Sequence, residues 1–91
     1  MPTFMALITY GDREVRDAAR PAHREYLQSL LDAGKLHESG PFTDDSGAAI
    51  VYVAADEAEA RGLLEADPYS QAGALAEARL VEWNILFRGT P

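Results

Sequence analysis

Two short segments of this sequence are apolar at almost every position rather than at every second one. Residues 3–10 (TFMALITY) and 48–54 (AAIVYVA) are rich in β-branched and aromatic side chains, and Gly11-Asp12 supplies a turn after the first of them. Such segments predict β-strands, and a strand that is apolar on both faces has to be covered on both. Any fold of this chain must therefore bury both faces of its sheet.

Helix signals lie between these strands. Pro21 suits the first position of a helix, which is predicted to run to Gly34, a residue that ends helices in the left-handed conformation. Its apolar face is predicted to consist of His23, Tyr26, Leu27, Leu30 and Leu31. A second helix is predicted from Asp56, whose spacing to Glu59 is that of a capping box, to about Ala66.

The remaining elements complete an alternating order. Residues 35–42 and 79–87 predict the second and fourth strands, the TDDSG sequence of residues 43–47 a turn, and residues 69–75 a short helical turn after Asp67-Pro68. The order β-α-β-β-α-β is that of a ferredoxin-like α+β fold, with a four-stranded antiparallel sheet and both helices on one face.

The uncovered sheet face predicts a partner. Two short helices cover one face only, so the other is expected to pack on a second copy of the chain and form a homodimer. The chain has 91 residues, no cysteine and two histidines, so neither disulfides nor a zinc site supplement its small core. Self-association is expected for this second reason too.

Composition excludes several classes of function. A formal net charge of −7 repels phosphate backbones, which argues against nucleic-acid binding. The longest apolar runs are far shorter than the ~20 residues that span a bilayer, and no basic leader precedes the first strand, so a cytoplasmic protein without a membrane segment is expected. The histidines lack metal-ligand spacing and the glycines form no phosphate loop, so neither a metal nor a cofactor is predicted.

His23 is the first candidate for chemistry. At the start of the predicted helix it would meet the partial positive charge of the helix end, which lowers the pKa of an imidazole and keeps it neutral. A neutral imidazole is able to act as a general base. The alternative is a hydrogen-bonded histidine at the edge of the core, with no chemical role.

Asp67 is the second candidate. Because both helices lie on one face of the sheet, His23 and Asp67 are expected to reach a common cleft, where the carboxylate would fix the tautomer of the imidazole. The alternative is structural, since Asp followed by Pro is a typical N-cap and N1 pair. Arg20 is either an anion clamp or an exposed surface residue, and Tyr69 either lines the cleft or packs in the core.

Three motifs together resemble a known family. They are Arg20-Pro21-Ala22-His23, Gly34-x-Leu36 followed by Gly40-Pro41, and Asp67-Pro68-Tyr69. In this order and spacing the chain resembles the YciI-like (YCII-related) family over nearly its whole length, as a single domain of residues 1–91.

The resemblance implies a dimeric α+β barrel, with His23 and Asp67 at the positions of the family's active-site residues. Arg20, Gly40, Pro41 and Tyr69, in the same motifs, are the expected substrate-binding residues. Among the proteins that this resemblance points to, one characterised relative is a dehydrochlorinase that acts on a chlorinated hydroxymuconate. Muconolactone isomerases share the same architecture. Relatives often carry a longer loop at residues 43–47, which leaves a shared substrate open.

Two interpretations of function follow. The first is a cofactor-independent enzyme, an isomerase, lyase or dehydrochlorinase, that uses the His23–Asp67 acid–base pair on a small acidic substrate. The second is a dimeric small-molecule-binding module without catalysis, in which the same two residues are a buried structural pair. A cofactor-independent monooxygenase is disfavoured, because nothing in the sequence singles out a substrate-activating pocket.

Overall fold

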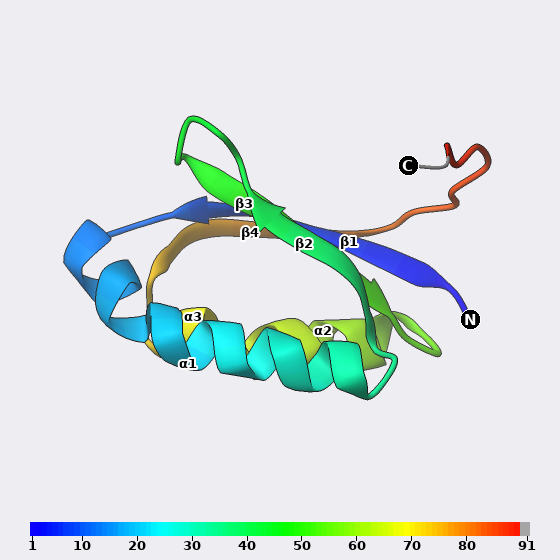
Figure 1. The fold of residues 1–91 in the computed structure, drawn as a ribbon, viewed down its shortest axis with the longest axis horizontal. Coiled ribbons are helices and arrows are strands. Elements are labelled where there is room, and N and C mark those ends of the chain that lie inside the picture. The colour runs from blue at the N-terminus through cyan, green and yellow to red at the C-terminus, as the bar shows by residue number, and fades with distance from the viewer. Residues whose placement is uncertain (90–91) are drawn as a thin grey trace.

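Four antiparallel strands form one sheet, and all helices lie on one face of it (Figure 1). This computed structural model describes residues 1–89, so the last two residues of the expected domain lie outside it. The sheet order is β2-β3-β1-β4. The elements are β1 (Thr3–Tyr10), α1 (Arg13–Asp32), β2 (Leu36–Pro41), β3 (Gly47–Val53), α2 (Glu57–Glu65), α3 (Pro68–Gln71) and β4 (Leu75–Glu82). The ferredoxin-like α+β fold is confirmed.

The core lies between the sheet and the helices. Ala6 and Ile8 of β1 pair with Ile50 and Ala48 of β3, and these side chains pack with Tyr52, Leu30, Leu64 and Tyr69. Alternate residues of the same strands point to the face without helices, where Met5 lies between Val51 and Val81. No element of residues 1–89 covers this second face, and none of their helices has the length and apolar character that crossing a bilayer requires.

Helix α1 begins at Arg13, so the prediction that it begins at Pro21 is wrong. Asp12 is its N-cap and accepts a hydrogen bond from the Val15 N–H at 3.0 Å. Pro21 lies inside the helix, where it has no N–H to give to the Asp17 carbonyl. Figure 1 shows the blue first turns of α1 set at an angle to the rest of the helix. His23 is therefore inside a long helix, and the argument from charge at a helix end does not apply to it.

Two other predicted boundaries move. Strand β4 covers residues 75–82 instead of 79–87, and just beyond its end the Trp83 N–H donates to the carbonyl of Thr3, the first residue of β1. The short helix covers residues 68–71 instead of 69–75, because Leu75 is already paired with Tyr10. Leu31, predicted to face the core, is 48 % exposed.

The turn between β2 and β3 is held against β1. The Ser46 carbonyl accepts from the Tyr10 N–H at 3.0 Å, and the Phe42 N–H donates to the Gly47 carbonyl at 2.8 Å. A Cβ at Gly47 would lie 1.9 Å from the Ile8 carbonyl oxygen, so only glycine allows this approach. The residue at position 47 therefore sets how closely the turn lies over one end of the sheet.

We expect Gly47→Ala to destabilise the fold by about 2–3 kcal/mol, because the clash is with backbone that cannot rotate away. Gly62→Ala is the matched control: an added Cβ meets nothing within 4 Å in the middle of α2, and alanine favours a helix over glycine by roughly 0.5–1 kcal/mol. Urea unfolding measures both. Equal effects of the two substitutions would contradict the assignment of Gly47.

Candidate active site

His23 and Asp67 are in direct contact. The imidazole Nδ1 lies 2.7 Å from Asp67 Oδ1, although the residues are 44 positions apart in sequence. Both are buried, with 8 % and 1 % of their surface exposed. In a neutral imidazole beside an ionised carboxylate, the Nδ1–H group donates a hydrogen bond to Oδ1, and Nε2 has the free lone pair.

Asp67 also begins helix α3. Its Oδ1 accepts from the Tyr69 N–H at 2.8 Å, so one oxygen serves both as the N-cap and as the partner of His23. Asp67 is therefore the N-cap that the structural interpretation requires, and the same oxygen contacts His23. Its other oxygen, Oδ2, is buried and has no hydrogen-bond partner among residues 1–89.

The ring of Tyr69 packs against the face of the His23 imidazole. The Tyr69 ring stacks on His23, with 3.8 Å between ring centroids and 8° between the planes. Tyr10 meets Tyr69 edge-on at 5.9 Å, and the Arg16 guanidinium lies 4.5 Å from the Tyr10 ring centroid. The imidazole is thus held by one hydrogen bond and one stacked ring.

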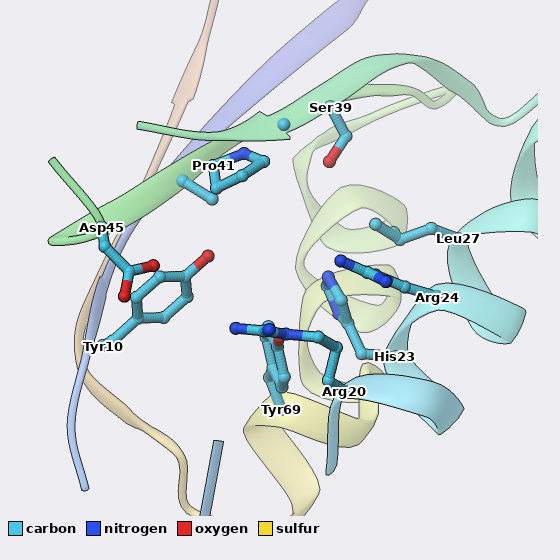
Figure 2. A pocket seen from close by; sticks show the side chains of 11 residues that line it. Tyr10, Arg20, His23, Arg24, Leu27, Ser39, Pro41, Asp45 and Tyr69 are labelled. Carbon is cyan, nitrogen blue, oxygen red and sulfur yellow. The ribbon is translucent and has the colours of Figure 1, made fainter. Parts of the chain in front are cut away.

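A cavity of about 290 Å³ opens beside these rings (Figure 2). It lies between α1, β2, the end of β1 and the β2–β3 turn. Five of the six predicted site residues line it: Arg20, His23, Gly40, Pro41 and Tyr69. Asp67 does not line it and lies behind His23. The structure adds Tyr10, Arg24, Leu27, Ser39, Asp45 and Ala48 to the lining.

The charges at the cavity do not balance. Arg16, whose side chain is only 4 % exposed, holds the Asp45 carboxylate with two contacts of 3.1 and 3.2 Å, which neutralises that acid. Asp17 Oδ1 lies 3.5 Å from the Arg20 guanidinium and 3.3 Å from that of Arg16, so the two arginines share this carboxylate. Arg24 has no carboxylate within ion-pair distance among the described residues. The cavity therefore carries an excess of positive charge on a chain that is anionic as a whole.

Hydrogen bonding to Tyr69 is the main cause that raises the pKa of Arg20, so its guanidinium stays charged beside the cavity. Arg24 follows Arg20 by one helical turn, a spacing that places both on one face of α1. That spacing is visible in the sequence and could have identified Arg24. Residues 1–89 contain no group of three or more side chains arranged to hold a metal ion.

The YCII-related domain family matches residues 3–84 of the sequence. The chain belongs to this family. No curated protein matches it. Among solved structures it is similar to the 5-chloro-2-hydroxyhydroquinone dehydrochlorinase of Burkholderia phenoliruptrix in complex with 2,5-dihydroxybenzoquinone, with 25 % identity, a TM-score of 0.77, and 90 % and 93 % of the two chains covered. That relative's substrate is a hydroxyhydroquinone and not the hydroxymuconate expected from the resemblance.

Two other similarities concern the fold alone. A putative antibiotic biosynthesis monooxygenase from Bacteroides thetaiotaomicron is 13 % identical, with a TM-score of 0.67 over 99 % of this chain and 93 % of that chain. A dimeric ferredoxin-like protein of unknown function from Thermobifida fusca is 18 % identical, with a TM-score of 0.53 over 92 % and 90 % of the two chains.

Tyr52 lies in the core under the site, and its buried hydroxyl has no partner among the described residues. Burial, then the charge of Asp67 and the proximity of Tyr26, raise the pKa of Tyr52 above its ordinary value of 10.0. The unfolded phenol ionises near that value and the folded one does not, so the stability contributed by the neutral phenol is present below pH 10 and is lost as pH rises.

We therefore expect the free energy of unfolding to fall above pH 10 by up to about 1.4 kcal/mol per pH unit for this group. Tyr52→Phe should flatten that decline and should be neutral or stabilising at pH 7, because it removes an unpaired buried hydroxyl. Urea unfolding between pH 8 and 11 measures both. An identical slope for the two chains would contradict the assignment to Tyr52.

Proposed function

We propose that this YCII-related protein is a cofactor-independent lyase or isomerase of the dehydrochlorinase type, acting on a small anionic ring compound. The observation that carries the proposal is the 2.7 Å contact between His23 Nδ1 and Asp67 Oδ1 beside a cavity of about 290 Å³. This volume is at the small end of ligand pockets, which suits a compound of about one ring.

His23 is the general base. Asp67 accepts a hydrogen bond from the Nδ1–H group and fixes the tautomer in which Nε2 has the lone pair. Nε2 takes a proton from a hydroxyl or an acidic C–H of the substrate, and the electron pair enters the conjugated system. In an elimination the pair leaves with chloride, and in an isomerisation another atom of the substrate is protonated. A positioned base contributes ~10²- to 10⁴-fold, so the substrate must already be acidic.

Arg20 and Arg24 bind the anionic oxygens of the substrate. Both line the cavity, and Figure 2 shows their side chains reaching toward it on either side of His23. Gly40 and Pro41 of β2 form the opposite wall of the cavity. Because Gly40 has no side chain, only its backbone meets the ligand. Tyr69 supplies an aromatic edge. The relative's complex with 2,5-dihydroxybenzoquinone supports a hydroxylated ring as the ligand class.

The test is chloride release from 5-chloro-2-hydroxyhydroquinone, and tautomer exchange in a panel of hydroxylated quinones. We expect His23→Gln and Asp67→Asn each to lower kcat at least 10²-fold, because each removes the base or its correct tautomer. His37→Gln, on β2 and outside the cavity, is the matched control and should turn over normally.

Thermal melting of the same variants separates catalysis from a structural pair. In the enzyme, His23→Gln loses turnover while it remains folded at assay temperature. If both variants lost several degrees of melting temperature and wild-type chain bound the quinones without converting any, the non-catalytic binding module would be the correct interpretation.

The second sheet face is the proposed dimer interface. Met5, Leu7, Val51, Val53 and Val81 lie on the face that no helix covers. The similarity to a dimeric ferredoxin-like protein supports this arrangement. A second copy packed by its own equivalent face would bury the partly exposed ones, Met5, Leu7, Val53 and Val81, from water around a two-fold axis.

We expect Leu7→Lys to weaken dimerisation about 10²- to 10³-fold, because an unpaired buried charge costs about 3–5 kcal/mol and each 1.4 kcal/mol is tenfold. Ala22→Lys adds the same charge to an exposed position of α1 and should leave association unchanged. Sedimentation equilibrium over a concentration series measures both. A wild-type chain that stays monomeric at every concentration would refute the interface.

A further inference from the structure

Tyr10 faces His23 across the cavity. It is the last residue of β1, whereas His23 comes from α1 on the other side, and Figure 2 shows the phenol hydroxyl directed into the space between the two walls. None of the hydrogen bonds within residues 1–89 uses this hydroxyl. The mechanism above leaves it without a role, although the lining places it opposite the base.

The Tyr10 ring is held in place from three directions. Two of these contacts are made by the ring itself, with the Arg16 guanidinium 4.5 Å from its centroid and Tyr69 edge-on at 5.9 Å, and the third fixes the backbone, where the Tyr10 N–H donates to the Ser46 carbonyl at 3.0 Å. A donor fixed before the substrate arrives needs no reorganisation when charge develops, and such preorganised donors are among the largest contributions to catalysis. The hydroxyl position is therefore set by the fold and not by the ligand.

The hydroxyl also carries its proton at neutral pH. Burial is the main cause that raises the pKa of Tyr10 above its ordinary value, and Tyr69 and Asp45 raise it further. Arg16 and Arg20 face the same group and act in the opposite direction, but the net shift is upward. Tyr10 is thus a donor over the pH range in which a histidine base works.

We propose that the Tyr10 hydroxyl is a catalytic donor to the substrate oxygen on which negative charge develops, opposite His23. The proposal rests on the function proposed above and narrows its substrate class: the ring carries an acidic hydroxyl or C–H at one end and a conjugated carbonyl oxygen at the other. Arg20 and Arg24 hold an anionic oxygen on the His23 side.

The proton and electron count closes without an oxidant or reductant. In an isomerisation, His23 Nε2 takes the substrate proton, the freed electron pair moves through the conjugated ring, and the carbonyl becomes an oxyanion. Tyr10 transfers its proton to that oxygen. The imidazolium of His23 then releases its proton to water and the tyrosinate takes one back from water, so that both groups return to their starting state. Where chloride leaves, the electron pair departs with the chloride, and Tyr10 keeps its proton and only donates a hydrogen bond to the oxygen.

The probe for the test is 2,5-dihydroxybenzoquinone, measured by the change in its visible absorption on binding. Tyr10→Phe keeps the ring that contacts Arg16 and Tyr69 and removes only the hydroxyl. We expect it to weaken binding of the quinone about 10- to 100-fold, which is the effect of losing one hydrogen bond to a charged group. Tyr26→Phe is the matched control, because the Tyr26 hydroxyl donates to the Leu63 carbonyl at 2.6 Å and does not line the cavity. It should bind within threefold of wild type.

A measurement on the unaltered chain keeps the test independent of how well a variant folds. With tyrosines labelled with ¹³C at Cζ, the Tyr10 resonance should move on saturation with the quinone, while that of Tyr26 stays in place. An unmoved Tyr10 resonance in the saturated protein would overturn the role of Tyr10.

The outcomes separate the two proposals. If Tyr10→Phe binds the quinone as tightly as wild type while His23→Gln and Arg24→Ala weaken binding, the donor role of Tyr10 is wrong and the proposed function stands. If wild-type chain does not bind the quinone at all, both the substrate class and the donor role are wrong.

Discussion

The buried contact between His23 and Asp67 determines the geometry of everything around it. Asp67 Oδ1 accepts two hydrogen bonds, one from the imidazole and one from the Tyr69 N–H that starts α3. Because the same oxygen begins a helix and orients the histidine, α3 cannot shift along its axis without moving the imidazole. Tyr69, which stacks on His23, is fixed by the same helix start. The orientation of the proposed base is thus a consequence of how one short helix begins.

The charges around the cavity determine which ligands can approach His23 and Asp67. The chain has a net charge of −7, which repels anions from most of its surface, yet the cavity lining carries two arginines. Arg16 prevents the one acid at the cavity, Asp45, from cancelling them, because it binds that carboxylate with two contacts. A local positive site on an anionic protein admits a small anion and still repels an extended polyanion. This arrangement fits a compact ring acid better than a nucleotide or a nucleic acid.

Much of the fold could be predicted from the sequence, because apolar strands and their order depend on local pattern. The errors occur where local preference competes with distant contacts. Pro21 suits a first helical position, but the Asp12 cap and the packing of α1 place it inside the helix. Residues 83–87 have strand composition, but β4 ends at Glu82, which pairs with Phe4 of β1.

The residues of the candidate site also fall into those that the sequence predicts and those that it does not. His23 and Asp67 could be proposed from motifs and from the layout of the two helices, and Arg24 from its spacing to Arg20. Tyr10 could not, because its direction depends on the register of β1 and on the turn that Gly47 holds against it. A residue whose role is set by two distant backbone contacts leaves no local pattern in the sequence.

Pro21 separates two parts of α1 that make different contacts. An unbent helix of 20 residues is a rod of roughly 30 Å, whose ends point in fixed directions. In this chain the first turns carry Arg16 to Tyr10 and Asp45, and the turns after Pro21 carry His23 and Arg24 to the opposite wall. One helix therefore contacts the β2–β3 turn through Arg16 in its first turns and lines the cavity through His23 and Arg24 in its later turns. Pro21, which misled the prediction of where α1 begins, lies between the turn that carries Arg16 and the turn that carries His23.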